Sequence, residues 1–221
     1  MKKKKLVLII VASLVLVVSL VMGIPFIVLG VKTAQLDVDY SYLKSDEQYS
    51  QKVEAKGLEL VKQHVSCGYA TIEMLSSFYG EKVTEDDLDA RNKTVSTSSS
   101  NGFLNEINKS IPQQTFVMKS YLHNDQFLKE IHDSLSKNNP VALEWAARYE
   151  NEWTLHFSII NGIDIGDDNV EVYNPYGYIE NISIDELINR ASFKSYTNMP
   201  LFLGFGFAFG AFHKNTLFFA Q

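Results

Sequence analysis

The sequence predicts an α+β domain, with a helical half packed on an antiparallel sheet, preceded by one apolar N-terminal helix. Three observations support this prediction. The chain starts with an uncharged apolar run, continues with apolar residues at helical spacing, and then shows β-branched runs separated by turn residues. Helices that precede strands along the chain are typical of α+β domains, and 221 residues suit one domain of this kind.

The N-terminal segment has the composition of a membrane-spanning helix. Residues 6–31 contain no charge, and a helix needs only about 20 apolar residues to cross a bilayer. The lysines at 2–5 predict a cytoplasmic tip at 1–5, with the body of the chain outside the cell. The alternative is a cleaved signal peptide, for which 28–30 is a passable cleavage site, but its apolar region is usually about 7–15 residues long. We therefore predict a single-pass signal-anchor, with a secreted form if the segment is cleaved.

Charge is distributed unevenly along the chain. The formal net charge is -6, but Lys2 to Lys5 and Lys32 all lie at its start. Without those five lysines, 15 basic residues are set against 26 acidic ones, a net charge of -11. Such an acidic body repels phosphate backbones, so we expect no nucleic-acid partner.

The body of the chain divides into a polar segment with spaced tyrosines at 32–52, predicted to be a stalk, and a domain at 53–221. Residues 94–102 are rich in Ser and Thr and predict a loop. Helices are predicted at 67–79, 84–91, 103–109, 125–137 and 183–190, the second and last with capping boxes that begin at Thr84 and Ser183. Strands are predicted at 116–118, 141–145, 155–165, 170–174 and 201–212, the last because phenylalanine alternates there with glycine and alanine.

The chain has one cysteine, Cys67, in a domain predicted to lie outside the cell. An unpaired thiol there cannot form an internal disulfide and risks oxidation. Cys67 is therefore either a nucleophile or a small buried apolar residue. Its place at the start of a predicted helix suits a nucleophile, because the unpaired amides of a helix N-terminus favour the thiolate.

A cysteine nucleophile needs an imidazole, a group that orients the imidazole, and a donor for the oxyanion. His156 lies inside an apolar run, where an unpaired imidazole is costly, and Asn174 ends the next predicted strand. Gln63, four residues before Cys67, can supply the donor. Taken singly, each has another explanation: a core histidine, a turn asparagine and a surface glutamine.

Contact between His156 and Asn174 places a condition on strand register. The two side chains must project from the same face of adjacent antiparallel strands. A plain four-residue loop at 166–169, which hydrophobicity favours, would place Asn174 opposite Asn161, on the face away from His156. We therefore predict a bulge or a loop of odd length between these strands.

Four segments in order resemble the papain-like peptidases of cysteine peptidase family thirty-nine, which includes bacteriocin leader-processing domains: 63–70, 78–80, 153–164 and 174–177. The likeness extends from about residue 62 to residue 190. It implies a papain-like cysteine peptidase fold, and it assigns Cys67 as nucleophile, His156 as general base and acid, Asn174 as its orienting group, and Gln63 as oxyanion donor. Asn174 stands where many members have Asp, and the spacing from Gln63 to Cys67 is shorter than in papain itself.

The resemblance implies a peptide or protein substrate, cleaved by hydrolysis. Acyl transfer to an amine and a catalytically silent, membrane-anchored binding module are the alternatives. The remaining histidines have no spacing that suggests a metal site, so we expect no metal or other cofactor. His64, three residues from Cys67, competes with His156 as the base, but we expect it to lack an orienting partner.

Overall fold

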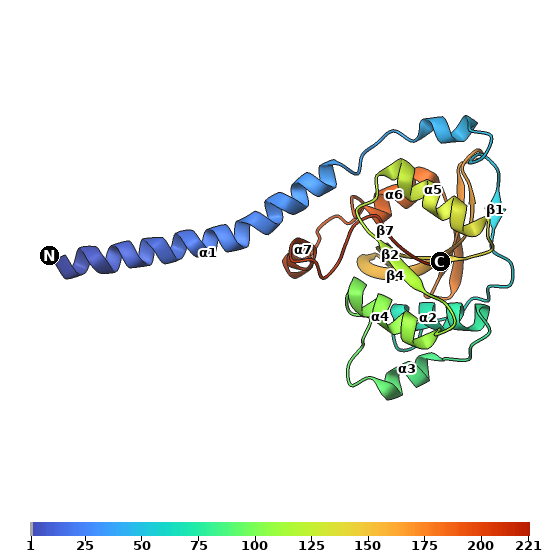
Figure 1. Ribbon diagram of the computed structural model, residues 1–221, viewed down its shortest axis with the longest axis horizontal. Helices are drawn as coiled ribbons and strands as arrows, with labels where there is room; N and C mark the ends of the chain where they lie inside the picture. Colours follow the sequence, from blue (N-terminus) through green and yellow to red (C-terminus); the bar gives the residue numbers. More distant parts are fainter. Residues whose placement is uncertain (1) are drawn as a thin grey trace.

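A seven-stranded antiparallel sheet organises the computed structural model, which describes residues 2–221 (Figure 1). Six strands lie in the order β2-β7-β3-β4-β5-β6, and β1 pairs with β4. The strands are β1 (Val53–Glu54), β2 (Phe116–Lys119), β3 (Val141–Tyr149), β4 (Glu152–Asp164), β5 (Asn169–Asn174), β6 (Tyr178–Ile182) and β7 (Thr216–Ala220).

Helices cover both faces of this sheet. On one face lie α2 (Cys67–Phe78), α3 (Glu85–Arg91) and α4 (Ser100–Ser110), and on the other α5 (Asn124–Leu135) and α6 (Ile184–Ala191) (Figure 1). Successive residues of β3 alternate between the two cores, since Ala142 packs with α2 and α4 while Leu143 packs with α5 and α6. The predicted α+β class is confirmed, and the helices form two layers rather than one helical half.

Side-chain caps define where the helices begin. The Ser66 hydroxyl accepts from the Tyr69 N–H at 3.2 Å, which makes Cys67 the first residue of α2. The capping box that begins at Thr84 is present at α3, and the Ser183 hydroxyl accepts the first-turn Glu186 N–H of α6. These helix starts were predicted from the sequence. Residues 100–102, predicted to lie in a loop, instead form the first turn of α4.

The prediction of a strand at 201–212 is wrong. Residues Leu201–Ala208 form helix α7, because Leu203 and Phe207, one helical turn apart, pack on Ala146 and Phe193. Alternation of phenylalanine with glycine and alanine satisfies a period of two, but it also places apolar side chains at helical spacing. The last strand is β7, which was not predicted and inserts between β2 and β3.

In the segment 32–52, predicted to be a stalk, residues 32–34 end helix α1 and the residues from 36 onward lie along the domain instead of standing away from it. Leu36 and Leu43 are buried, and the Asn124 N–H at the start of α5 donates to the Leu36 carbonyl at 2.8 Å. A short 3-10 helix, Ser41–Ser45, carries Leu43 into the core beneath α5.

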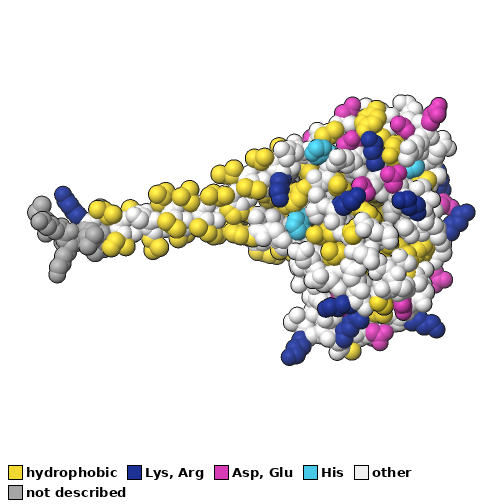
Figure 2. Space-filling model, in the orientation of Figure 1, with side chains coloured by type: hydrophobic (Ala, Val, Ile, Leu, Met, Phe, Trp, Pro, Cys, Tyr) yellow, Lys and Arg dark blue, Asp and Glu magenta, His cyan; other side chains and the backbone are white. Residues whose placement is uncertain are grey.

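Helix α1 (Lys2–Ala34) extends away from the domain (Figure 1). Among the described residues, α1 is the one helix that is both long enough and apolar enough to cross a membrane. The candidate span is Ile9–Ala34, with a mean hydropathy of 2.8. No part of its most apolar stretch is buried against the domain. Figure 2 shows this helix as an apolar neck.

Candidate active site

Cys67 is the first residue of α2 and is half-buried against β4. Burial raises the pKa of its thiol to about 11, although backbone hydrogen bonds from Phe157 and Gly68 act in the opposite direction. The thiol therefore meets β4 at Phe157, one residue from His156, and is protonated at neutral pH.

A bulge in β4 sets which side chains meet on the sheet. Gly162 pairs with Glu171, but the next pair is Ile160 with Val172, which leaves Asn161 unpaired. Continuing that register places Asn174 on the same face as His156. The predicted bulge is confirmed.

The bulge also keeps the apolar side chains of β4 and β5 on one face, the pattern that had favoured a register without a bulge. Ile160 and Ile163 flank the bulge and both face the core under α5 and α6, together with Val170 and Val172. In a regular strand, Ile160 and Ile163 would face opposite sides. One extra residue thus aligns the core residues and the site residues on the same face.

His156 and Asn174 are in contact, with 2.9 Å between Nε2 and Oδ1. The Tyr176 N–H donates to the same Asn174 oxygen at 3.0 Å, so this atom is an acceptor and His156 Nε2 carries the proton. Nδ1 is then the basic nitrogen of the neutral ring. Burial lowers the pKa of His156 to about 3, the hydrogen bond with Asn174 opposes this, and the positive charge of Arg190 adds to the lowering.

Gln63 is tied to the turn that follows Asn174, because its backbone N–H donates to the Pro175 carbonyl at 2.7 Å. Its side-chain oxygen is buried and has no hydrogen-bond partner among residues 2–221. Gln63 lines a pocket of about 400 Å³ with Lys62, Tyr149 and Tyr176. The Tyr176 ring stacks on His156 with 4.2 Å between centroids, which brings this pocket next to the imidazole.

The four predicted residues do not form one continuous chain of contacts. His156 touches Asn174, Gln63 is fixed to the turn after Asn174, and Cys67 meets the strand beside His156. Within the part of the chain that the structure describes, no hydrogen bond joins Cys67 to His156. Thiol and imidazole are both neutral in this arrangement.

The profile of the family described as "Peptidase_C39 like family" matches residues 47–200, more than half of the chain. The chain belongs to the Peptidase_C39 like family. It is a cysteine peptidase, as the resemblance implied, and its family cleaves peptide bonds.

A solved structure similar to this C39-like peptidase is the double glycine motif protease of an AMS/PCAT transporter, in complex with the leader peptide. The two chains are 13% identical, with a TM-score of 0.48, and the match covers 77% of this chain and 99% of the other. A search of curated proteins found no match.

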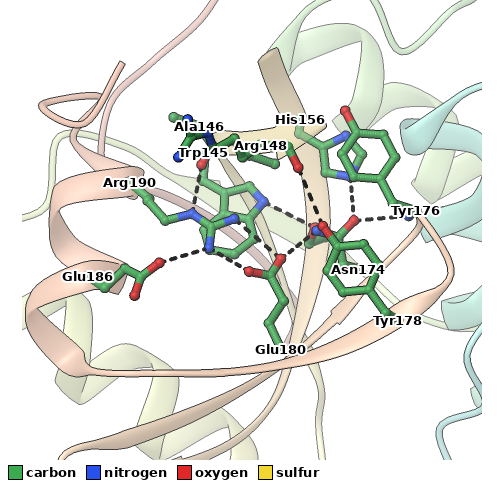
Figure 3. A network of polar contacts seen from close by, with 12 residues as sticks. Trp145, Ala146, Arg148, His156, Asn174, Tyr176, Tyr178, Glu180, Glu186 and Arg190 are labelled. Atoms are coloured by element: carbon green, nitrogen blue, oxygen red, sulfur yellow. Dashed lines mark hydrogen bonds and ion pairs between the residues drawn. The ribbon is translucent and has the colours of Figure 1, made fainter. Parts of the chain in front are cut away.

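Behind the Asn174 side chain, the C39-like peptidase holds an ion pair that sequence reasoning missed (Figure 3). The Asn174 amide donates to Glu180 at 2.6 Å, and Glu180 accepts from Arg190 at 2.6 Å. Arg190 also donates to the Ala146 carbonyl at 2.9 Å, and its guanidinium lies 3.5 Å from the centroid of the Trp145 ring. Glu180 therefore fixes the Asn174 amide with its oxygen toward His156.

A sequence signal for Glu180 did exist. Asn174 pairs with Tyr178 across the three-residue turn 175–177, so alternate residues of β6 face the same side as Asn174. Glu180 is the next such residue. Arg190, in the last turn of a capped helix, is explained equally well by the helix dipole, and nothing in the sequence couples it to Glu180.

His64 does have orienting partners, contrary to the prediction. Its Nδ1 lies 3.1 Å from Glu85 and its Nε2 lies 2.9 Å from Asp86, both at the start of α3. The hydrogen bond with Asp86 is the largest of the effects that raise the pKa of His64. Because both ring nitrogens are engaged by carboxylates, His64 offers no free base to Cys67.

Glu85 holds the segment that leads to the nucleophile. Its buried carboxylate accepts the backbone N–H groups of His64, Val65 and Ser66 at 2.9–3.0 Å. In the described residues, no group of three or more His, Cys, Asp and Glu side chains is arranged to hold a metal ion. The site offers a thiol, an imidazole and amides for chemistry.

Proposed function

We propose that this peptidase hydrolyses a peptide bond through a triad of Cys67, His156 and Asn174, with Gln63 as oxyanion donor. The observation that supports this most directly is the hydrogen bond between His156 and Asn174. It requires a bulge in β4, and it leaves Nδ1 as the basic nitrogen on the strand that meets the thiol. A histidine with only a structural role in the core would need a hydrogen-bond partner, but it would not need this register between β4 and β5.

In the proposed reaction, the substrate draws the two neutral groups together, since catalytic hydrogen bonds often tighten only when substrate binds. The Cys67 proton moves to His156 Nδ1 as sulfur attacks the carbonyl carbon. The side-chain amide of Gln63 donates to the oxyanion. The protonated imidazole then gives its proton to the leaving amine, which departs and leaves an acyl group on Cys67.

Water completes the cycle. His156 Nδ1 removes a proton from water, the hydroxide oxygen bonds to the acyl carbon, and the carbon–sulfur bond breaks with the proton returning to sulfur. Asn174 holds the ring throughout but carries no charge to stabilise the imidazolium. Glu180, hydrogen-bonded to Asn174, places the nearest fixed negative charge of this network behind it.

We further propose that α1 crosses the membrane and holds the peptidase domain outside the cell. After Lys5, α1 carries no charge as far as Val31, and its most apolar stretch is not buried against the domain, as expected for a helix surrounded by lipid. Lysines 2–5 fix the cytoplasmic end. The substrate is a peptide or protein segment that reaches the pocket beside Gln63.

The test is the rate of Cys67 alkylation by iodoacetamide at pH 7, measured by mass spectrometry on the full chain. His156→Ala should slow alkylation by about 10²–10⁴-fold, the usual contribution of a general base. His64→Ala is the matched control and should have no effect, because its ring faces α3. Equal rates in wild type and His156→Ala would contradict the triad.

The pH dependence of the same reaction gives a second readout. A thiol of pKa about 11 that is not assisted by His156 is alkylated at a rate that rises with pH towards 11, and this is the profile expected for His156→Ala. In wild type, a plateau of reactivity at neutral pH that is absent from His156→Ala indicates that His156 takes the thiol proton. Once a peptide that this protein cleaves is known, its products in the presence of added amine distinguish the two reactions. Hydrolysis gives a free acid, and acyl transfer gives an amide of the added amine.

A further inference from the structure

Helix α7 has an apolar side that the domain does not cover. Residues 199–212 contain no polar or charged side chain. Leu203 and Phe207 use one side of the helix to pack on the domain. On the other side, Leu201 and Phe202 are 74% and 75% exposed. A helix that is apolar on all sides is expected to be fully buried or in contact with lipid.

We define the α7 face as Leu201, Phe202, Phe205 and Phe209. It continues directly into the surface of α1, because the Phe205 ring meets the Phe26 ring edge-on with 5.2 Å between centroids. Residues of both helices, together with Tyr121 and His213, line a pocket of about 280 Å³ whose walls are mostly apolar. The α7 face and the exposed neck of α1 therefore form one apolar surface (Figure 2).

The contact with α1 sets the height of α7 relative to a bilayer whose cytoplasmic boundary is placed at Lys5. An α-helix rises about 1.5 Å per residue, so the 20 residues after Lys5 span about 30 Å, the thickness of the hydrocarbon core. That span ends at Pro25. Phe26 and Phe205 then lie where hydrocarbon gives way to headgroups, the depth at which aromatic side chains collect in membrane proteins.

Basic side chains lie around this apolar surface although the domain as a whole is acidic. Lys32 lies 4.6 Å from the centroid of the Tyr121 ring, and Lys214 lies 5.9 Å from that of Phe207. Cations next to an apolar helix face match the charge of anionic lipid headgroups.

We propose that the α7 face docks into the headgroup region of the bilayer that α1 crosses, so that the peptidase domain rests on the membrane surface. The inference rests on the proposed anchoring by α1. A lipid surface fits better than a protein partner, because the face is level with the end of the span and continuous with a helix surface of the same kind.

The test uses spin labels at single cysteines in full-length Cys67→Ser chains, reconstituted in nanodiscs that contain anionic lipid. Labels replace Phe202 on the α7 face, Leu16 in α1, and Lys52 beside β1, which is exposed on the far side of the domain from α1 (Figure 1). Circular dichroism confirms that each variant is folded. Accessibility to oxygen and to a water-soluble nickel complex reports the environment of each label.

The expected result is that the labels at Phe202 and Leu16 are less accessible to the nickel complex and more accessible to oxygen than the label at Lys52. A Phe202 label as accessible to nickel as Lys52, with Leu16 in lipid, overturns the docking and leaves the anchor intact. A water-exposed Leu16 label overturns both. Dipolar coupling between Phe202 labels on separate chains shows that a second copy covers α7, and it also overturns docking to lipid.

Discussion

Two carboxyl groups on opposite faces of the sheet, one mostly buried and one fully buried, have different partners. Glu180, on the face of His156, forms an ion pair with Arg190 and accepts from Asn174. Glu144, on the face of α4, is fully buried, and one of its oxygens has no partner among the described residues. Burial raises the pKa of Glu144 to about 8, while hydrogen bonds from Ser100 and from the backbone of His213 oppose the shift.

The difference shows where this domain retains charge in its interior. Beside the site, a carboxylate is paired with a buried cation and accepts a hydrogen bond from the amide that it orients. Away from the site, the carboxyl group can take a proton instead, which costs less than an unpaired charge. Four substitutions test this contrast.

The largest effect is expected from Arg190→Met. It leaves Glu180 mostly buried without its closest cation, and loss of one partner of a buried ion pair costs about 3–5 kcal/mol. Urea unfolding measures the loss. Adding Glu180→Gln should restore much of it, because no unpaired charge remains. A double variant no more stable than Arg190→Met would show that the arginine acts through packing on Trp145 alone.

Glu180→Gln alone should have a smaller effect on stability. Glutamine can still accept hydrogen bonds and Glu186 remains as a counter-ion, so the expected loss is about 1.5–3 kcal/mol, that of a hydrogen bond to a charged group. Cys67 alkylation at pH 7 should slow as well, since the Asn174 amide is free to turn. Glu186→Gln is the matched control: it removes an exposed partner of the same arginine and should cost about 0–1 kcal/mol. Unchanged alkylation in Glu180→Gln would mean that Asn174 needs no positioning group.

Glu144→Gln should change how stability depends on pH. The folded-state pKa of Glu144 is about 8 and its ordinary value is 4.5, so the folded protein binds the proton more tightly. The contribution of Glu144 protonation to the free energy of unfolding is complete below pH 4.5. It is lost, at about 1.4 kcal/mol per pH unit, as the pH rises to about 8. The difference in unfolding free energy between wild type and Glu144→Gln, measured by urea unfolding at several pH values, should follow that slope. A flat difference would place a cation near Glu144.

Ser100→Ala is expected to have the smallest effect. It removes the hydroxyl that donates to Glu144 and so costs about 0.5–1.5 kcal/mol, as for an ordinary hydrogen bond. The same unfolding measurements apply. Since the hydroxyl favours the ionised carboxylate, the variant should also move the Glu144 transition to higher pH, and a shift to lower pH would reverse the assigned roles.

Local signals in the sequence predicted much of the fold. Thr84 and Ser183 cap the starts of α3 and α6, and β-branched runs mark β3, β4 and β5, because caps and periodicity act over a few residues. The order of strands was beyond this kind of reasoning. Strand β7 inserts between β2 and β3, a pairing across about one hundred residues that no local pattern encodes.

The candidate site was predicted in part for a different reason. The contact of His156 with Asn174 followed from requiring both on one face, a geometric condition that hydrophobicity alone did not supply. Glu180 and Arg190 were missed because their roles depend on side chains meeting between two elements. Helix α7 was missed because its pattern fits two periods, and only packing of Leu203 and Phe207 decides between them.

The bulge at Asn161 also bears on how this strand can change length among relatives. The residues on either side already pair with consecutive residues of β5, so Asn161 is the one residue that β5 does not match. A chain that lacks it would pair regularly and keep His156 facing Asn174. Homologous sequences one residue shorter between the histidine and the glycine at 162 can therefore conserve the same site, and a gap there is no sign that the activity has been lost.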